Sequence, residues 1–274
     1  MLAGTTVAAA RYDFERLPDD DELTKMAYRF AWYQRNPGAE NLDPAIDMQD
    51  MLEKFNEFND FTINFTPLHG LENAHKLAQL LIDLVLCNPV QQRLTLINLP
   101  PESNIKITSS SLTYLKASSS PGLTTLDLSN CPALTHLLAS CNPVLTDLDL
   151  SNCPALIFLN VCKNPRLSAL DLSHNPALTV LRAYDNPGLM ALDVTNNARL
   201  RELRVGNNSE LAALNLSNNP ALKYLYAFYN PLLTNFKIGA TQVSAGLIAL
   251  INDMVAENRA RLGLPTADAA EHIE

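Results

Sequence analysis

The residues of this chain that could carry out chemistry fall into three small groups, and the first is helical in spacing. His69, Glu72 and His75 lie three residues apart, so a helix would offer two imidazoles and a carboxylate to a metal. Helical carboxylate sites of this kind need a second Glu-x-x-His motif on another helix, and the chain has none. We therefore interpret the group as surface residues near a helix start, and we expect no metal and no cofactor.

The second group combines cysteine and histidine. His136, Cys141 and Cys162 lie close in the sequence, and a Cys–His pair is a common nucleophilic arrangement. No acid that orients the imidazole and no oxyanion donor can be identified beside them, so we expect no catalytic residue here. The chain also lacks a phosphate-binding Gly motif and has nine glycines in all.

The third group is a series of carboxylates spaced 22 residues apart: Asp127, Asp149, Asp171 and Asp193. Aligned carboxylates attract Ca²⁺ when six or more oxygens converge. Each Asp is followed two residues later by Ser or Thr, and such a carboxylate is also satisfied by hydrogen bonds to nearby hydroxyl and backbone groups. We favour the local bonds, and a cation at this column remains the open alternative.

Composition excludes two classes of function. The 274 residues carry a formal charge of −9, and residues 11–60 contain thirteen acidic and six basic residues, so nucleic acid would be repelled. The longest apolar run, Leu77 to Leu86, contains Asp83 and is too short to cross a bilayer, so we expect no membrane insertion. The N-terminus lacks the basic segment of a secretory signal, and five cysteines without metal-ligand spacing indicate buried thiols in a reducing compartment.

An eleven-residue repeat must position these groups. From Leu115 to Phe236 an apolar residue recurs at every eleventh position, with further apolar residues two and eight positions later, so the unit is LxxLxLxxN. Such a period also fits a right-handed helical coil. Proline follows most of the Asn or Cys positions, however, and each interior proline costs a helix about 3 kcal/mol. The LxL element is therefore a short strand and Asn-Pro a turn.

The stretch LTTLDLSNCPALTHLLASCNPVLTDLDLSNCPAL resembles the leucine-rich repeat family, whose pattern is LxxLxLxxN/CxL. The resemblance implies an α/β repeat solenoid of parallel strands with helical caps. Because both halves carry the strand pattern, the chain resembles the nested bacterial class with coils of about 22 residues and two strand arms. The last position of the unit forms a ladder that should bond backbone groups of its own and adjacent coils: Cys131, Asn142, Cys153, Asn164, Asn175, Asn186, Asn197, Asn208, Asn219 and Asn230.

The two arms differ in their outward residues. The first arm, which contains Leu126 and every 22nd residue after it, is small and monotonous outside. The second arm, which contains Leu137 and its equivalents, varies at every coil, and one outward column reads Ser140, Cys162, Tyr184, Gly206, Phe228. Aromatic residues and Arg anchor protein interfaces; alternatively, the rings only stack to stabilise the sheet. The predicted partner-binding residues are His136, Phe158, Asn160, Arg182, Tyr184, Glu202, Arg204, Tyr224, Tyr226 and Phe228.

Helices are predicted at both ends of the repeats. Residues 1–90 form a helical cap region with helices over Asp19–Arg35, from Asp43, and over about Leu71–Cys87, the last being the most buried. Short strands are expected at Phe61–Phe65 and Leu94–Leu99. The solenoid occupies residues 91–241, a cap helix that begins at Ser244 lies within 242–265, and residues 266–274 are an acidic tail.

These patterns predict a non-enzymatic module that binds another protein and is a monomer on its own. The family resemblance implies a bacterial protein, either cytoplasmic or translocated into a host cell as an effector. A narrower version is an inhibitor that plugs the active site of a partner enzyme. The alternative is an enzyme whose site lies in the N-terminal helical region, with the repeats selecting substrate.

Overall fold

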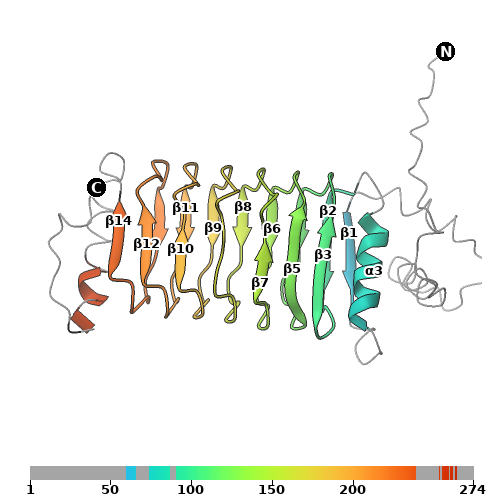
Figure 1. Ribbon diagram of the computed structural model, residues 1–274, viewed down its shortest axis with the longest axis horizontal. Helices are drawn as coiled ribbons and strands as arrows, with labels where there is room; N and C mark the ends of the chain where they lie inside the picture. Colours follow the sequence, from blue (N-terminus) through green and yellow to red (C-terminus); the bar gives the residue numbers. More distant parts are fainter. Residues whose placement is uncertain are drawn as a thin grey trace, which may run out of the picture.

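The computed structural model describes residues 60–65, 74–86 and 91–238, together with residues 253, 255–258, 260, 261 and 263. The repeats form a parallel β-solenoid in which short strands stack in two facing layers along the long axis (Figure 1). Each LxxLxLxxN unit contributes one arm, so the leucine-rich-repeat-like fold expected from the sequence is present.

The second arm forms one continuous sheet of eight parallel strands. Its register steps by 22 residues, as Leu137 pairs with Leu159 and Leu203 with Leu225. The first step is irregular, because Leu94 pairs with Leu115, 21 residues away. In spatial order the strands are β1 (Asp60–Asn64), β2 (Arg93–Ile97), β4 (Tyr114–Lys116), β6 (His136–Leu138), β8 (Phe158–Asn160), β9 (Val180–Arg182), β11 (Glu202–Arg204) and β13 (Tyr224–Tyr226).

The first arm is divided into two three-stranded parallel sheets, where the sequence predicted one unbroken stack. Leu170 and Leu172 keep their buried positions between the two sheets, but their backbone is not a strand. Spacing accounts for this, since the bond from Met190 N to Ser168 O is stretched to 3.5 Å. The strands are β3 (Ser103–Thr108), β5 (Leu123–Asn130) and β7 (Asp147–Asp149), then β10 (Ala191–Asp193), β12 (Ala213–Leu216) and β14 (Asn235–Ile238).

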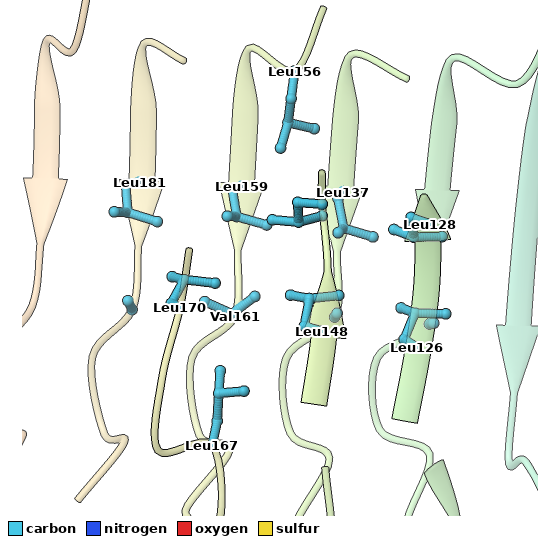
Figure 2. Packing of buried hydrophobic residues seen from close by; sticks show 14 of the residues in the cluster. Leu126, Leu128, Leu137, Leu148, Leu156, Leu159, Val161, Leu167, Leu170 and Leu181 are labelled. Atoms are coloured by element: carbon cyan, nitrogen blue, oxygen red, sulfur yellow. The ribbon is translucent and has the colours of Figure 1, made fainter. Parts of the chain in front are cut away.

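The core is a slab of leucines between the two arms (Figure 2). Leu137, Leu156 and Leu159 are completely buried, and burial of each such side chain contributes roughly 1.5–3 kcal/mol. Within residues 91–238 neither half of a coil contains a helix, so the helices of the predicted α/β class lie outside the repeats.

The predicted amide ladder is confirmed, and it is better bonded on the second arm. Asn164 Nδ2 donates to Ala139 O and Val161 O at 2.9 and 2.7 Å, while its Oδ1 accepts the backbone N–H of Asn142 at 2.9 Å. The residue before each second-arm Asn has a positive φ, such as 59° at Cys141, which turns the following N–H towards the next coil. On the first arm Asn175 donates two similar bonds, but its buried Oδ1 has no hydrogen-bond partner.

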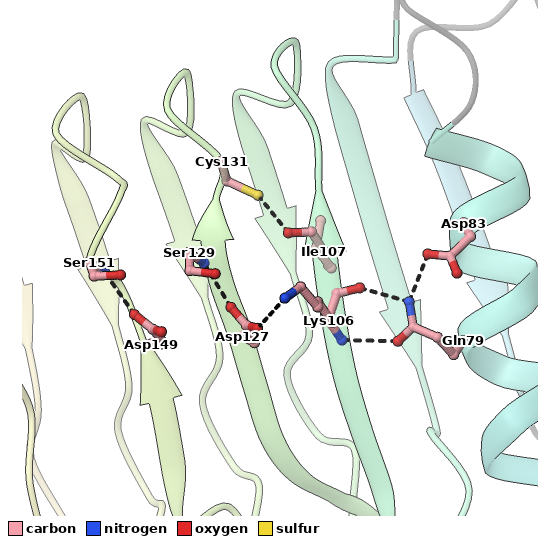
Figure 3. A network of polar contacts seen from close by, with 9 residues as sticks. All are labelled: Gln79, Asp83, Lys106, Ile107, Asp127, Ser129, Cys131, Asp149 and Ser151. Carbon is pink, nitrogen blue, oxygen red and sulfur yellow. Dashed lines mark hydrogen bonds and ion pairs between the residues drawn. The ribbon is translucent and has the colours of Figure 1, made fainter.

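Helical residues contact both ends of the described solenoid. The helix α3 (Ala74–Leu86) packs against β3, where the Gln79 side chain bonds both the N–H and the C=O of Lys106 at 2.9 and 2.7 Å (Figure 3). This amide pairs backbone groups that an edge strand leaves open. At the other end Asn258, in the helical segment 255–258, donates to Asn230 O and Leu233 O at 2.8 and 3.1 Å.

Some predictions lie outside the described residues: the helices over Asp19–Arg35 and from Asp43, the helix start at Ser244, and the acidic tail. The strand predicted at Phe61–Phe65 is present as β1, so the second-arm sheet extends into the segment assigned to the helical cap region. In the part of the chain that the structure describes, no helix is long and apolar enough to span a membrane.

Candidate functional site

The second-arm face brings all ten predicted partner-binding residues onto one side of the solenoid. Pairing of β6, β8, β9, β11 and β13 aligns them in columns that run along the solenoid axis. Alternation along each strand directs residues such as His136 and Leu138 outward and Leu137 into the core. The face is therefore continuous, although its two ends use their side chains differently.

At the N-terminal end the rings stack on one another. The ring centroids of Tyr114 and His136 are 6.4 Å apart, and those of His136 and Phe158 are 6.0 Å apart. The guanidinium carbon of Arg93 lies 4.0 Å from the centroid of the Tyr114 ring. Such contacts stabilise a sheet by a few tenths of a kcal/mol to about 1 kcal/mol each. For this half of the face, the stacking alternative accounts for the rings.

In the middle, one carboxylate holds two guanidinium groups. Glu202 Oε1 accepts a hydrogen bond from Arg182 Nε at 3.2 Å and lies 2.7 Å from Arg204 Nε. The Arg204 N–H is not aligned with the oxygen, so Nε is buried without a hydrogen bond and this contact is electrostatic. The Arg182 guanidinium also lies 5.4 Å from the Phe158 ring and that of Arg204 4.8 Å from the Tyr226 ring. Both arginines are thereby fixed in orientation.

At the C-terminal end the rings are exposed. Tyr224, Tyr226 and Phe228 are 57, 45 and 41% exposed, and Tyr229 on the adjoining turn is 71% exposed. Among the residues that the structure describes, exposed large apolar side chains are few, and these four fall within six residues of sequence. This clustering is the feature that most distinguishes the face from the rest of the surface.

Two positions of the variable face behave differently from their columns. Cys162 was expected to point outward but is only 1% exposed, and desolvation raises its pKa to about 11. Asn160 Oδ1 accepts the backbone N–H of Cys162 at 3.2 Å, which closes a local turn. Asn160 therefore has a turn-forming role, while Tyr184 is half-buried in the next coil.

The first-arm face carries the Asp column, and the predicted local bonds are confirmed. Asp127 and Asp149 each accept the backbone N–H two residues ahead at 2.9 Å (Figure 3), as do Asp171 and Asp193. Desolvation raises the pKa of Asp127, but bonds from Ser129 and the Lys106 ammonium at 3.2 Å outweigh it, so that pKa lies below its usual value. In Asp171 the bond from Ser173 lowers the pKa.

The remaining chemical candidates do not converge in the described residues. Burial raises the pKa of the Cys131 and Cys153 thiols to about 11 and 12, the opposite of an activated nucleophile. His69 and Glu72 lie outside the described residues, and His75 is half-buried on α3. No group of three metal-binding side chains occurs in residues 60–65, 74–86 and 91–238 or in the described C-terminal residues.

A shallow hollow of about 430 Å³ lies near α3, β3 and β5. It is lined mainly by hydroxyl and amide side chains, including Thr108, Ser110 and Asn130, and by the apolar Leu86. None of its described lining residues is acidic, basic or a thiol, so this hollow offers hydrogen bonds without a group for acid–base or nucleophilic chemistry.

Sequence reasoning missed several members of the second-arm face. Tyr114 and Lys116 flank Leu115 in the same register and could have been assigned outward positions. Arg93 was beyond reach, because its coil is one residue shorter than the repeat. Tyr229 occupies the turn position with positive φ, which the strand pattern does not describe.

Comparisons with known proteins identify no family. No protein-family model matches the sequence, and no curated protein matches it. Among solved structures, the chain is similar to the functional domain of InlJ from Listeria monocytogenes, described as including a cysteine ladder, with 22% identity and a TM-score of 0.36. The match covers 56% of this chain and 45% of that chain, so this chain spans less than half the length of that structure.

Proposed function

We propose that the chain is a protein-interaction module that binds a partner protein through the second-arm face. The observation that carries the proposal is the cluster of exposed rings at Tyr224, Tyr226, Phe228 and Tyr229 beside two oriented arginines. Aromatic residues and Arg are the residue types that contribute most to protein interfaces. The opposite face supports this choice by contrast, since its outward residues are small or locally bonded Asp side chains.

The nested 22-residue class, the non-enzymatic character and the monomeric state are part of the same proposal. The 22-residue register of both arms supports the first of these. Action as a translocated effector, or as an inhibitor of a partner enzyme, stays a prediction that the binding partner would decide.

Affinity capture with a matched variant tests the proposal. Wild type and the double variant Arg204→Glu/Tyr226→Ala would be used as baits in bacterial and host lysates, with captured proteins identified by mass spectrometry. We expect the variant to keep the wild-type melting temperature, because both side chains are at least partly exposed, and to lose one discrete partner. Identical captured sets, or empty ones, would refute binding at this face.

A further inference from the structure

The exposed rings and the arginine pair lie close enough to act as one contact surface. Arg204 and Tyr226 pair across β11 and β13, and the other rings belong to the same last coil. Toward the N-terminus each ring is stacked on another, whereas Tyr226 alone of the four exposed rings has a described ring contact, with Arg204. The aromatic–arginine patch consists of Arg182, Arg204, Tyr224, Tyr226, Phe228 and Tyr229.

The arginine pair has capacity to spare for an anionic group. Glu202 offsets one of the two positive charges of Arg182 and Arg204, and its contacts involve their Nε atoms. Within the described residues no partner is seen for the terminal guanidinium nitrogens. A guanidinium whose plane is already fixed loses little entropy on forming a two-point contact with a carboxylate.

The two faces of the solenoid have opposite charge. Outward positions of β2 to β13 on the second arm contain Arg93, Lys116, Arg182 and Arg204 against the single acid Glu202. On the first arm, outward strand positions contain Lys106 and Lys237 against five acids, namely Asp127, Asp147, Asp149, Asp171 and Asp193. The second-arm face therefore favours an acidic partner surface. The carboxylate of Glu202, set between the arginines, favours discrete carboxylates over a continuous phosphate chain.

A glycine opens a gap in the side-chain column beside the arginines. Tyr184, Gly206 and Phe228 continue the column of Arg182, Arg204 and Tyr226. The two rings are two coils apart, roughly 10 Å, and Gly206 places no side chain between them. A Cβ at Gly206 would lie 2.9 Å from Phe228 O, so the backbones are closely packed at this point. An apolar side chain of a partner can reach the backbone here between two rings.

We propose that the aromatic–arginine patch binds an acidic, aromatic-bearing extended segment of a partner protein. A carboxylate of the segment contacts Arg182 and Arg204, and an aromatic or large apolar side chain enters between Tyr184 and Phe228. The inference rests on the proposed function and adds the end of the face that makes the contact and the chemistry of its partner.

Selection from a displayed library of short random peptides on the immobilised full chain tests this. Representative peptides, labelled with a fluorophore, would be titrated by anisotropy against wild type, the patch variant Arg204→Ala/Phe228→Ala and the control variant Lys116→Ala/His136→Ala from the stacked half. We expect selected peptides to be enriched in Asp or Glu and in aromatic residues. Affinity should fall about tenfold or more in the patch variant and less than about twofold in the control.

Two further arms separate charge from folding. Replacement of Asp and Glu in the peptide by Asn and Gln should weaken binding about tenfold, and added salt should weaken the acidic peptide more than the neutral one. Arg204→Lys retains the charge without the planar fork, so it should still lose affinity with no change in melting temperature. Equal binding of neutral peptides, or full retention of affinity in Arg204→Lys, would overturn the carboxylate contact.

The outcomes also distinguish this inference from the proposed function. Loss of peptide binding in the control variant alone, or equally in both variants, would keep binding on the second-arm face but overturn the assignment to the patch. Peptide binding that neither variant affects would remove both ideas. No selected peptide above background, or concentration-dependent self-association of wild type that the patch variant abolishes, would overturn the assignment of an acidic partner segment.

Discussion

Two ladder asparagines with the same sequence context should differ in their contribution to stability. Asn164 on the second arm makes three hydrogen bonds through its side chain, to two carbonyls and from the Asn142 N–H. Asn175 on the first arm makes two and carries a buried Oδ1 without a partner. A buried polar group left unpaired costs about 1–3 kcal/mol. Asn164→Ala should therefore cost about 3–5 kcal/mol and Asn175→Ala about 1–3 kcal/mol.

Replacement by Cys sharpens the comparison, because the first arm already has Cys131 and Cys153 at ladder positions, each donating its thiol to a carbonyl. Asn175→Cys should cost less than Asn164→Cys by about 1–3 kcal/mol. Urea unfolding followed by circular dichroism, with the slope checked for each variant, measures both differences. If the two Asn→Ala variants are equally destabilised, or Asn175→Ala is the worse, the difference between the ladders is not the one described.

Three further results are expected. Asp171 has a lowered pKa, so its contribution to stability is present above its unfolded pKa near 3.9 and is lost as pH falls through the folded value; Asp171→Asn, which imitates Asn215 in the same column, should show a smaller loss of unfolding free energy between pH 5 and pH 3. Gly122→Ala should destabilise by about 1–3 kcal/mol or more in thermal unfolding, since its Cβ would lie 2.0 Å from Pro100 O, and a neutral result would contradict that contact. Among the described thiols, Cys141 should react fastest with a thiol reagent in the native state, as read by mass spectrometry of labelled peptides, because it is the least buried; faster labelling of any of the others would contradict their burial: Cys131, Cys153 and Cys162.

The solenoid itself could be predicted because its signal is repeated. Leu137 and Leu159 occur in the same register as ten further apolar positions, and proline at most turns excludes the competing helical coil. The division of the first arm could not be foreseen, since Leu170 fits the pattern as well as its neighbours do. That difference arises from spacing between coils, which depends on the turn with positive φ and the amide bonds that follow it.

The candidate site was predictable in outline but not in detail. Alternation along the strands placed Arg204 and Tyr226 on the variable face. It could not show that His136 is stacked between two rings whereas Tyr224 is free of such contacts in the described structure, since both occupy the same column. It also could not show that Cys162 is buried at an outward position.

The central claim is that a partner contacts the second-arm face rather than the first. A photo-cross-linking amino acid at Tyr226 on β13, compared with one at Ala213 on the neighbouring first-arm strand β12, tests it most directly in lysate. Both sites are exposed, so both reach solution equally well. A discrete cross-linked protein obtained from position 226 and not from position 213 is the predicted result. The same product from both positions, or a product from position 213 alone, would contradict the account.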